Sequence, residues 1–277
     1  CSDMQVLAWA LRAYGMYLFE AGLPRYLLVY AITASQDLFP ACKPWLNLAW
    51  QIDRKWQLHE PGSCRAVLPA VIVKAMACLA GLWNWKCWTG VFLLGFAGML
   101  HPSEMLALTR KDLVFPRDLN YDQPALYLRV RDPKTARFAR RQHSRVDDAG
   151  IISIAESAFG SLPLSEKLYP GSINTFRRQW NCIMDALGIP CKQRDNGATP
   201  GVLRGSGATY FYTSTEDLSW VAWRGRWSRV KTLEFYLQEV GSHMLIHELD
   251  NWAKAKIFPL ADAAPAVLWR VFDLAVQ

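Results

Sequence analysis

The segment Arg224–Tyr236, RGRWSRVKTLEFY, joins a basic, tryptophan-bearing turn to a stretch of helical character that presents a tyrosine near its end. A tyrosine hydroxyl has an ordinary pKa of about 10, and it is a poor nucleophile until cations and hydrogen-bond donors surround the group that it attacks. The function of Tyr236 therefore depends on which other side chains the fold brings to it.

The composition is that of a globular protein with an anionic partner. The chain has 277 residues, of which 52% are hydrophobic and 20% charged, and its formal net charge is +7. This length suits one large domain or two ordinary ones. The basic residues concentrate in two stretches, Arg129–Arg145 (RVRDPKTARFARRQHSR) and Arg224–Lys231. Such stretches suit a phosphate backbone, although solvated surface loops have the same composition.

The cysteines and the apolar runs exclude several other classes of protein. Seven cysteines, at positions 1, 42, 64, 78, 87, 182 and 191, form no CxxC pair and no metal-ligand spacing with histidine, so we expect reduced thiols, an intracellular protein, and neither metal nor cofactor. The apolar run from Val67 to Leu100 is interrupted by Lys74, Asn84 and Lys86. Its uninterrupted pieces are too short to cross a bilayer, so two core helices are expected and no membrane association.

Hydrophobic spacing predicts a helical first domain. Apolar residues recur with helical period from Met4 to about Trp56, and EAGLPR, residues 20–25, separates the first two helices. The segment LHEPGSCRAVLP, residues 58–69, is rich in turn-forming residues and indicates a linker. We therefore expect domains at 1–62 and 63–277.

The second domain is expected to be mainly helical with a small antiparallel sheet. Pro102 and Glu104 favour a helix start after His101. Strands are predicted at 125–130 and 143–148, on either side of a basic connection. Helices are predicted at 69–81, 85–99, 150–160, 172–187, 201–213, 216–224 and 228–239, with a final helix near 262–275 that follows Pro259 and Pro265.

Four segments, taken in chain order, carry a family resemblance: HPSE (101–104), PKT (133–135), TPGVLRGSGATYFY (199–212) and GRWSRVKTLEFY (225–236). The succession resembles the catalytic domain of tyrosine recombinases, the integrase family that cuts and rejoins DNA through a tyrosine, over residues of roughly 65 to 240. Trp227 stands nine residues before Tyr236, and Arg204 stands 23 residues before Trp227, as in Cre-like members. The residues of these motifs look most like those of recombinases of eukaryotic mobile elements.

The resemblance implies a role for each matching residue. Tyr236 attacks a DNA phosphodiester and holds it as a 3′-phosphotyrosine. Arg204 stabilises the transition-state charge, Lys134 donates a proton to the departing 5′-oxygen, and Trp227 donates its indole N–H to the phosphate. Glu104 holds a nearby cation or helix terminus. The resemblance also implies that residues 1–60 clamp double-stranded DNA, that copies of the chain assemble on DNA, and a nuclear location in a eukaryotic host.

Two positions depart from the family pattern. His101 stands where the family has its first arginine, and Gly201 stands where it has the histidine of His-x-x-Arg. An imidazole cannot reproduce the bidentate fork of a guanidinium, and glycine has no side chain at all. The loss of one such donor commonly costs about 10²- to 10³-fold in rate. The pattern therefore predicts a member of doubtful catalytic competence.

Three hypotheses remain open on the sequence. The first is an active site-specific recombinase or integrase. The second is a decayed relative that binds DNA without cutting it. The third is a helical interaction protein with no nucleic-acid role, in which Tyr236 is a half-buried helix residue, Lys134 a solvated charge and Arg204 a capping or pairing group. Salt-dependent DNA binding separates the third hypothesis from the others, and covalent capture of DNA separates the first from the second.

Overall fold

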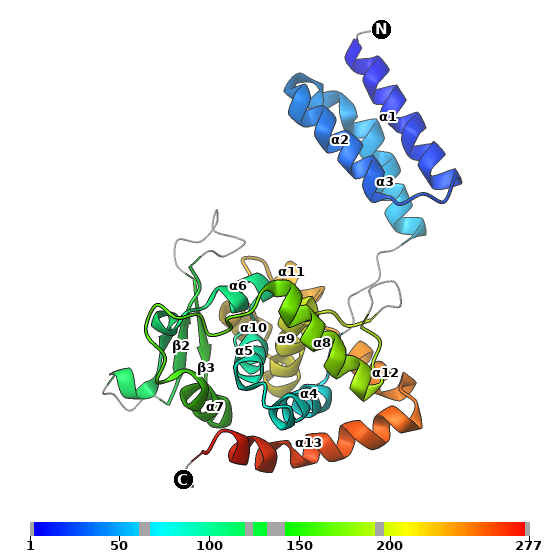
Figure 1. Ribbon diagram of the computed structural model, residues 1–277. Helices are drawn as coiled ribbons and strands as arrows, with labels where there is room; N and C mark the ends of the chain where they lie inside the picture. Colours follow the sequence, from blue (N-terminus) through cyan, green and yellow to red (C-terminus); the bar gives the residue numbers. More distant parts are fainter. Residues whose placement is uncertain (1–2, 61–66, 120–123, 132–141, 192–196, 275–277) are drawn as a thin grey trace. The chain divides into compact units, whose positions relative to one another are not determined.

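The computed structural model describes residues 3–60, 67–119, 124–131, 142–191 and 197–274 (Figure 1). The fold is mainly α-helical with one small antiparallel sheet, so the predicted fold class is confirmed. The chain divides into two compact units, Cys1–Ser63 and Cys64–Gln277. Each unit is described by itself.

The described residues of the first unit form the helices α1 (Asp3–Glu20), α2 (Tyr26–Leu38), the 3-10 helix η1 (Pro40–Leu46) and α3 (Asn47–His59). Gly15 allows α1 to approach α2 closely, because a Cβ at this position would lie 2.8 Å from Leu28 Cδ2. Asp53 on α3 is buried and accepts a hydrogen bond from Arg25 Nη1 at 2.6 Å. Burial of apolar residues from all four helices holds the unit together, and one ion pair ties the start of α2 to α3.

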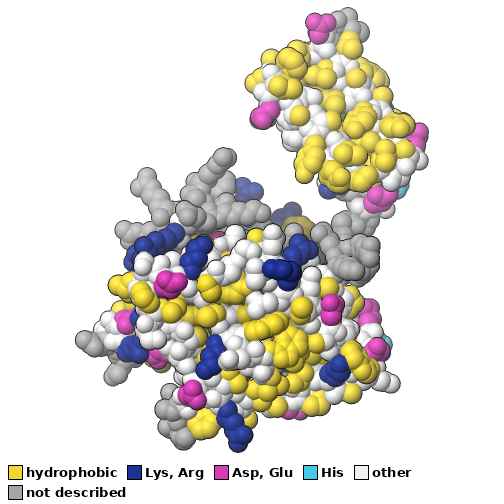
Figure 2. Space-filling view, viewed as in Figure 1, with side chains coloured by type: hydrophobic (Ala, Val, Ile, Leu, Met, Phe, Trp, Pro, Cys, Tyr) yellow, Lys and Arg dark blue, Asp and Glu magenta, His cyan; other side chains and the backbone are white. Residues whose placement is uncertain are grey.

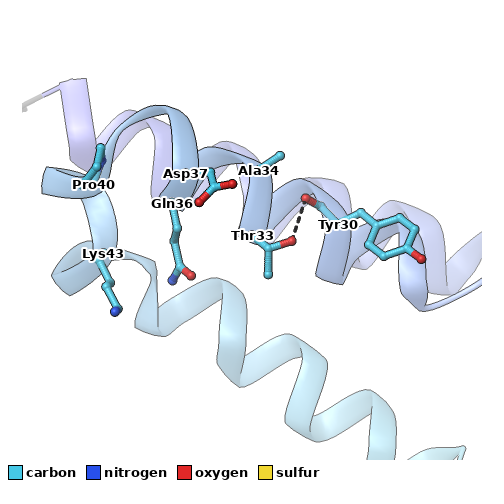
Figure 3. A pocket seen from close by; sticks show the side chains of 7 residues that line it. All are labelled: Tyr30, Thr33, Ala34, Gln36, Asp37, Pro40 and Lys43. Atoms are coloured by element: carbon cyan, nitrogen blue, oxygen red, sulfur yellow. Dashed lines mark hydrogen bonds between the residues drawn. The ribbon is translucent and has the colours of Figure 1, made fainter. Parts of the chain in front are cut away.

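The surface of the first unit is rich in aromatic side chains. Trp9, Tyr17, Tyr26 and Tyr30 are each more than half exposed, and hydrophobic atoms cover much of the face that Figure 2 shows. An open pocket lies where α2 meets η1; seven side chains line it, among them Tyr30 and Lys43 (Figure 3). The Thr33 hydroxyl there donates to the Tyr30 carbonyl, within the helix.

The second unit contains most of the helices. They are α4 (Ala70–Leu82), α5 (Lys86–Ala97), α6 (Pro102–Ala107), α7 (Ala149–Phe159), α8 (Ile173–Leu187), α9 (Leu203–Thr215), α10 (Leu218–Arg224), α11 (Val230–Glu234), α12 (Glu239–Glu248) and α13 (Asn251–Val271), with short 3-10 helices η2 (Arg110–Asp112), η3 (Pro116–Leu119) and η5 (Pro200–Val202). The apolar run from Val67 to Leu100 forms the two helices α4 and α5, as expected. Across the part of the chain that the structure describes, no helix combines the length and apolar character that a membrane span requires.

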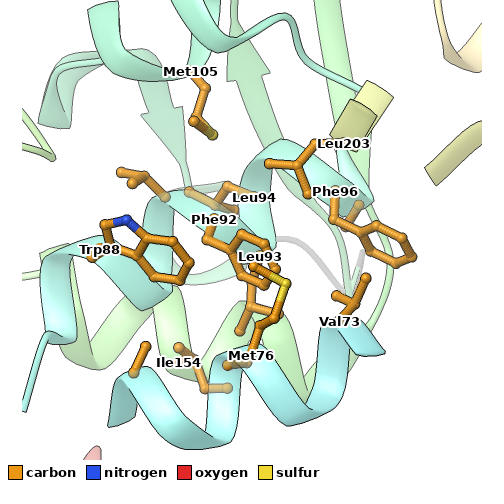
Figure 4. Packing of buried hydrophobic residues seen from close by; sticks show 14 of the residues in the cluster. Val73, Met76, Trp88, Phe92, Leu93, Leu94, Phe96, Met105, Ile154 and Leu203 are labelled. Atoms are coloured by element: carbon orange, nitrogen blue, oxygen red, sulfur yellow. The ribbon is translucent and has the colours of Figure 1, made fainter. Parts of the chain in front are cut away.

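The core of the second unit lies around α5. Trp88 stacks on Phe92 and on Phe176 of α8, with ring centroids 4.8 and 5.1 Å apart. Figure 4 shows Phe92 and Met76 pointing into the space between α5 and α4. A Cβ at Gly90 would lie 2.5 Å from Phe159, so only glycine admits this close packing of α7 on α5.

The sheet has three short antiparallel strands in the order β1 (Leu113–Val114), β2 (Leu126–Arg129) and β3 (His143–Val146). Leu126 pairs with Val146 and Arg129 with His143. The two longer strands match the predicted ones, whereas β1 was not predicted. Two residues are too few for a periodic signal, and the pairing with β2 creates this strand.

Two predicted helices are wrong in their bounds. The helix expected over 228–239 ends at Glu234, because the Thr209 hydroxyl donates to the Tyr236 carbonyl and accepts the Gln238 N–H, which draws the backbone onto α9. A separate helix, α12, then begins at Glu239. The final helix begins at Asn251 rather than near 262, and both prolines lie inside it.

Packing explains how α13 tolerates its prolines. An interior proline removes a backbone hydrogen bond and costs about 3 kcal/mol in an isolated helix. One face of α13 is buried as the helix runs along α4 (Figure 1). The buried residues are Ala253, Ile257, Ala261, Ala264 and Leu268. This burial outweighs the local preference.

The described cysteines form no disulfide bonds. Cys42, Cys78 and Cys191 are buried, Cys87 is half-buried, and Cys182 is exposed. Burial raises the pKa of Cys78 and of Cys87 above the ordinary value. Cys1 and Cys64 lie outside the described residues.

Candidate functional site

Tyr236 lies just beyond the end of α11 and packs against α9. Its side chain is half-buried, and its ring centroid is 5.3 Å from that of Trp227. A Cβ at Gly205 of α9 would lie 3.5 Å from Tyr236 Cδ1, so the small residues of α9 leave room for the tyrosine ring. The tyrosine is therefore held between a helix face and an indole ring.

Arg204, in the first turn of α9, points into the protein and is 5% exposed. Its Nη1 donates to the Met99 carbonyl and its Nη2 to the Gly225 carbonyl, each at 2.6 Å. The guanidinium carbon lies 4.1 Å from the centroid of the Trp227 ring, in a cation–π contact. Backbone carbonyls on two sides and an aromatic ring fix the orientation of this cation.

The electrostatics of Arg204 link it to Tyr236. The pKa of Arg204 is lowered to about 10, first by burial and second by the positive charge of Arg226. The charges of Glu104 and of an ionised Tyr236 act in the opposite direction. Arg204 is therefore cationic at neutral pH in a poorly solvated position, and an ionised Tyr236 oxygen stabilises it.

The Trp227 ring connects the arginine and the tyrosine. Its face meets the Arg204 guanidinium, and its centroid is within stacking range of Tyr236. A side chain at Gly225 would overlap the Trp227 ring, so the glycine allows the indole to fold back over this turn. The sequence predicted an indole N–H bond to phosphate, and that role stays a prediction.

Glu104, in the first turn of α6, contacts a second arginine. Its Oε2 accepts from the His101 backbone N–H at 3.0 Å and from Arg226 Nη2 at 2.8 Å. Burial by itself raises the pKa of Glu104, but the Arg226 charge and the His101 N–H outweigh it, so the pKa lies below its ordinary value. Glu104 is therefore an ionised, buried partner of Arg226.

Sequence reasoning did not single out Arg226. Its side chain is 8% exposed, its backbone is left-handed with φ +62°, and its Nη2 lies 3.4 Å from the Met99 carbonyl, which also accepts from Arg204. The Nε atoms of Arg204 and Arg226 are both buried and have no hydrogen-bond partner among the described residues. The only sequence signal for Arg226 was its place in the basic turn RGRW, which does not reveal the direction of a side chain.

The remaining candidate positions lie around this cluster or outside the described residues. His101 is the half-buried residue that precedes α6, and Gly201 lies in η5, one turn before Arg204. Lys134 lies outside the described residues, so its predicted role as proton donor stays a prediction. No cluster of three or more His, Cys, Asp or Glu side chains suited to a metal ion occurs among the residues whose positions are given.

The structure thus brings Tyr236, Arg204, Trp227 and Glu104 into one connected cluster and adds Arg226 to it. Two guanidinium groups face a single carboxylate among the described members of the cluster. Fixed, poorly solvated cations beside a tyrosine provide the arrangement that binds a phosphate group and activates a hydroxyl for attack on it.

Comparison with known proteins gives only distant likeness. No family model and no curated protein matches the chain. Among solved structures, the XerH site-specific recombinase bound to difH substrate in a pre-cleavage complex is similar at 14% identity, over 78% of this chain and 67% of that one, with a TM-score of 0.45. The post-cleavage complex of XerH with palindromic difH substrate gives 13% identity over 88% and 79%, with a TM-score of 0.47.

Proposed function

We propose that this protein breaks and rejoins DNA strands through Tyr236. The observation that carries the proposal is the placement of buried Arg204, whose guanidinium lies on the Trp227 ring that also packs against Tyr236. A cation held in this way by backbone carbonyls keeps its geometry without a reorganisation cost when charge develops on a phosphate.

The proposed step exchanges one phosphoester bond for another. The Tyr236 oxygen attacks the phosphorus and forms a new O–P bond, while the bond from phosphorus to the 5′-oxygen breaks. The tyrosine proton leaves to solvent or a nearby base, and the departing 5′-oxygen takes up a proton, a role proposed for Lys134. The product is a 3′-phosphotyrosine, which conserves the bond energy, so the reverse attack by a 5′-hydroxyl rejoins DNA without a nucleotide cofactor.

The partner in this proposal is double-stranded DNA. A net charge of +7 and the basic stretch Arg129–Arg145 supply cations for the backbone phosphates. The first unit, with the helices α1 to α3, is proposed to clamp the duplex. Assembly of several copies on DNA, action on a mobile element and a nuclear location belong to the same proposal.

Covalent capture tests the proposal. Pools of nicked duplexes are incubated with the native chain, Tyr236→Phe and the matched control Tyr212→Phe, and products are separated on a denaturing gel. Tyr212 packs against the same apolar cluster as Tyr236, so this control reports the loss of a hydroxyl beside the site. We expect adducts from the native chain and from Tyr212→Phe and none from Tyr236→Phe. Adducts that persist in Tyr236→Phe would contradict the proposal.

A second candidate function is DNA binding without cleavage. The observation that favours it is the replacement of two donors, with His101 and Gly201 at positions where the resemblance implies arginine and histidine. This candidate predicts salt-dependent DNA affinity and no adduct from the native chain. Adducts that form only in a His101→Arg/Gly201→His variant would show a site whose chemistry has decayed.

A further inference from the structure

The sequence lacks one of the arginines that the family resemblance implies near the scissile phosphate. The two non-bridging oxygens of a phosphodiester under attack gain negative charge, and planar guanidinium forks match them best. Arg204 is one such group, but the position expected to supply the second holds His101.

Arg226 reaches this region from a different element. It belongs to the turn between α10 and α11, whereas His101 precedes α6. The Met99 carbonyl accepts from Arg204 Nη1 at 2.6 Å and lies 3.4 Å from Arg226 Nη2. Because one oxygen joins them, these two nitrogens lie no farther apart than the sum of the two distances. The two guanidinium groups are therefore neighbours.

The fold holds Arg226 in place at a cost in backbone energy. A non-glycine residue with φ +62° is in a sparsely populated conformation that the surroundings must stabilise. The stabilising contact is Glu104 Oε2, at 2.8 Å from Arg226 Nη2, and Glu104 is itself bound to the backbone N–H of His101. The segment His101–Glu104, which has no arginine at position 101, thus supplies the Glu104 carboxylate that orients Arg226.

The cluster has cationic and hydrogen-bonding capacity to spare. Among the described residues, Glu104 is the single carboxylate that pairs with the two buried arginines. Within the described part of the chain, the Nε–H groups of Arg204 and Arg226 have no hydrogen-bond partner, and an unsatisfied buried donor costs about 1–3 kcal/mol. Proximity of Arg226 also disfavours the charged form of Arg204. An anionic phosphate beside the pair offsets the repulsion between the two cations.

We propose that Arg226 supplies the second guanidinium to the scissile phosphate, in place of the arginine that the sequence lacks at position 101. This inference rests on the proposed function. Arg226 neutralises charge on a non-bridging oxygen, and Glu104 is the positioning residue that directs it.

A change in the charge of the substrate tests the inference. A methylphosphonate at the cleavage position replaces one charged non-bridging oxygen by a methyl group, so it needs less neutralisation. Adduct rates are measured on the duplex recovered from the reactive pool, in phosphodiester and methylphosphonate forms, for the native chain, Arg226→Ala, Arg226→Gln and the control Arg270→Ala. Arg270 is an exposed arginine on α13, outside both basic stretches, and thermal unfolding of each variant verifies the fold.

We expect Arg226→Ala and Arg226→Gln to slow adduct formation about 10²- to 10³-fold on the phosphodiester and no more than about tenfold on the methylphosphonate. Arg270→Ala leaves both rates near those of the native chain. Equal losses on the two substrates, or no loss, would overturn the role of Arg226 while the proposed function stands. If the native chain forms no adduct on the phosphodiester and none on the methylphosphonate, both the role of Arg226 and the proposed function would be overturned.

Discussion

The second unit contains two densely packed regions of opposite character. Around Trp88, the core is aromatic and apolar, with Phe92 and Phe176 stacked on it. Around Trp227, an aromatic ring instead covers a buried guanidinium, and the neighbouring backbone is left-handed at Met99 and Arg226. Contacts in the first region stabilise the fold. In the second region, the described residues leave the Nε donors of Arg204 and Arg226 without partners, and the backbone is strained.

The two regions therefore differ in what they contribute: the apolar core contributes to stability, and the arginine cluster contributes to activity. Apolar burial contributes directly to folding, so a cavity in the first region lowers the free energy of unfolding. Buried charges contribute little net stability because desolvation offsets their attraction. A fold that nonetheless retains two buried arginines at one place indicates a function for them.

The largest effect on stability is expected in the apolar core. Phe92→Ala removes a fully buried ring between α4 and α5 and lowers the free energy of unfolding by about 3–5 kcal/mol. Denaturant titration measures this loss. The matched control Phe258→Ala, at a 43% exposed position on α13, changes it by about 0.5 kcal/mol or less. Similar losses for the two variants would show that Phe92 is not a core residue.

In the arginine cluster the largest effect falls on activity. Arg204→Lys keeps a positive charge but loses the fork that contacts the Met99 and Gly225 carbonyls. Adduct formation slows about 10²- to 10³-fold, while stability changes less than in Phe92→Ala. Rate measurements on trapped adducts test this, with Arg270→Lys, at an exposed position of α13, as the control. A fully active Arg204→Lys would remove the central arginine from the mechanism.

At the turn before Trp227, we expect one substitution to reduce both stability and activity, by an intermediate amount. Gly225→Ala places a methyl group on the indole ring, so the ring moves off Arg204 and the protein loses about 1–3 kcal/mol of stability together with activity. In contrast, a Cβ at Gly241 on α12 meets only ordinary contacts, and Gly241→Ala is neutral or stabilising by about 0.5–1 kcal/mol. Tryptophan fluorescence and thermal unfolding separate the two variants.

The smallest effect concerns pH. Because the folded-state pKa of Glu104 lies below its ordinary value of 4.5, its contribution to stability is present above that value and is lost as the pH falls through the folded pKa. Glu104→Gln therefore flattens the acid side of the stability curve, by at most about 1.4 kcal/mol per pH unit. Glu248→Gln, at an exposed position of α12, serves as control. An unchanged acid slope in Glu104→Gln would contradict the ion pair with Arg226.

The sequence predicted the helical fold class and most of the helices, because long apolar periodicities such as that of α5 are local signals. It placed Arg204, Trp227 and Tyr236 in one candidate site by their spacing, and the structure brings them into contact. Contacts between distant segments produced the differences. The Thr209 hydroxyl ends the helix before Tyr236, packing on α4 keeps two prolines inside α13, and a left-handed turn directs Arg226 to Glu104.

Identification of the residue that carries DNA is the most direct test of strand cleavage by Tyr236. Adducts formed by the native chain are digested with nuclease and protease, and mass spectrometry locates the peptide that retains a 3′-phosphonucleotide. We expect this group on Tyr236, in the peptide that follows the GRW turn. Its presence on another residue, or its absence from a protein that binds DNA with steep salt dependence, would contradict strand cleavage by this site.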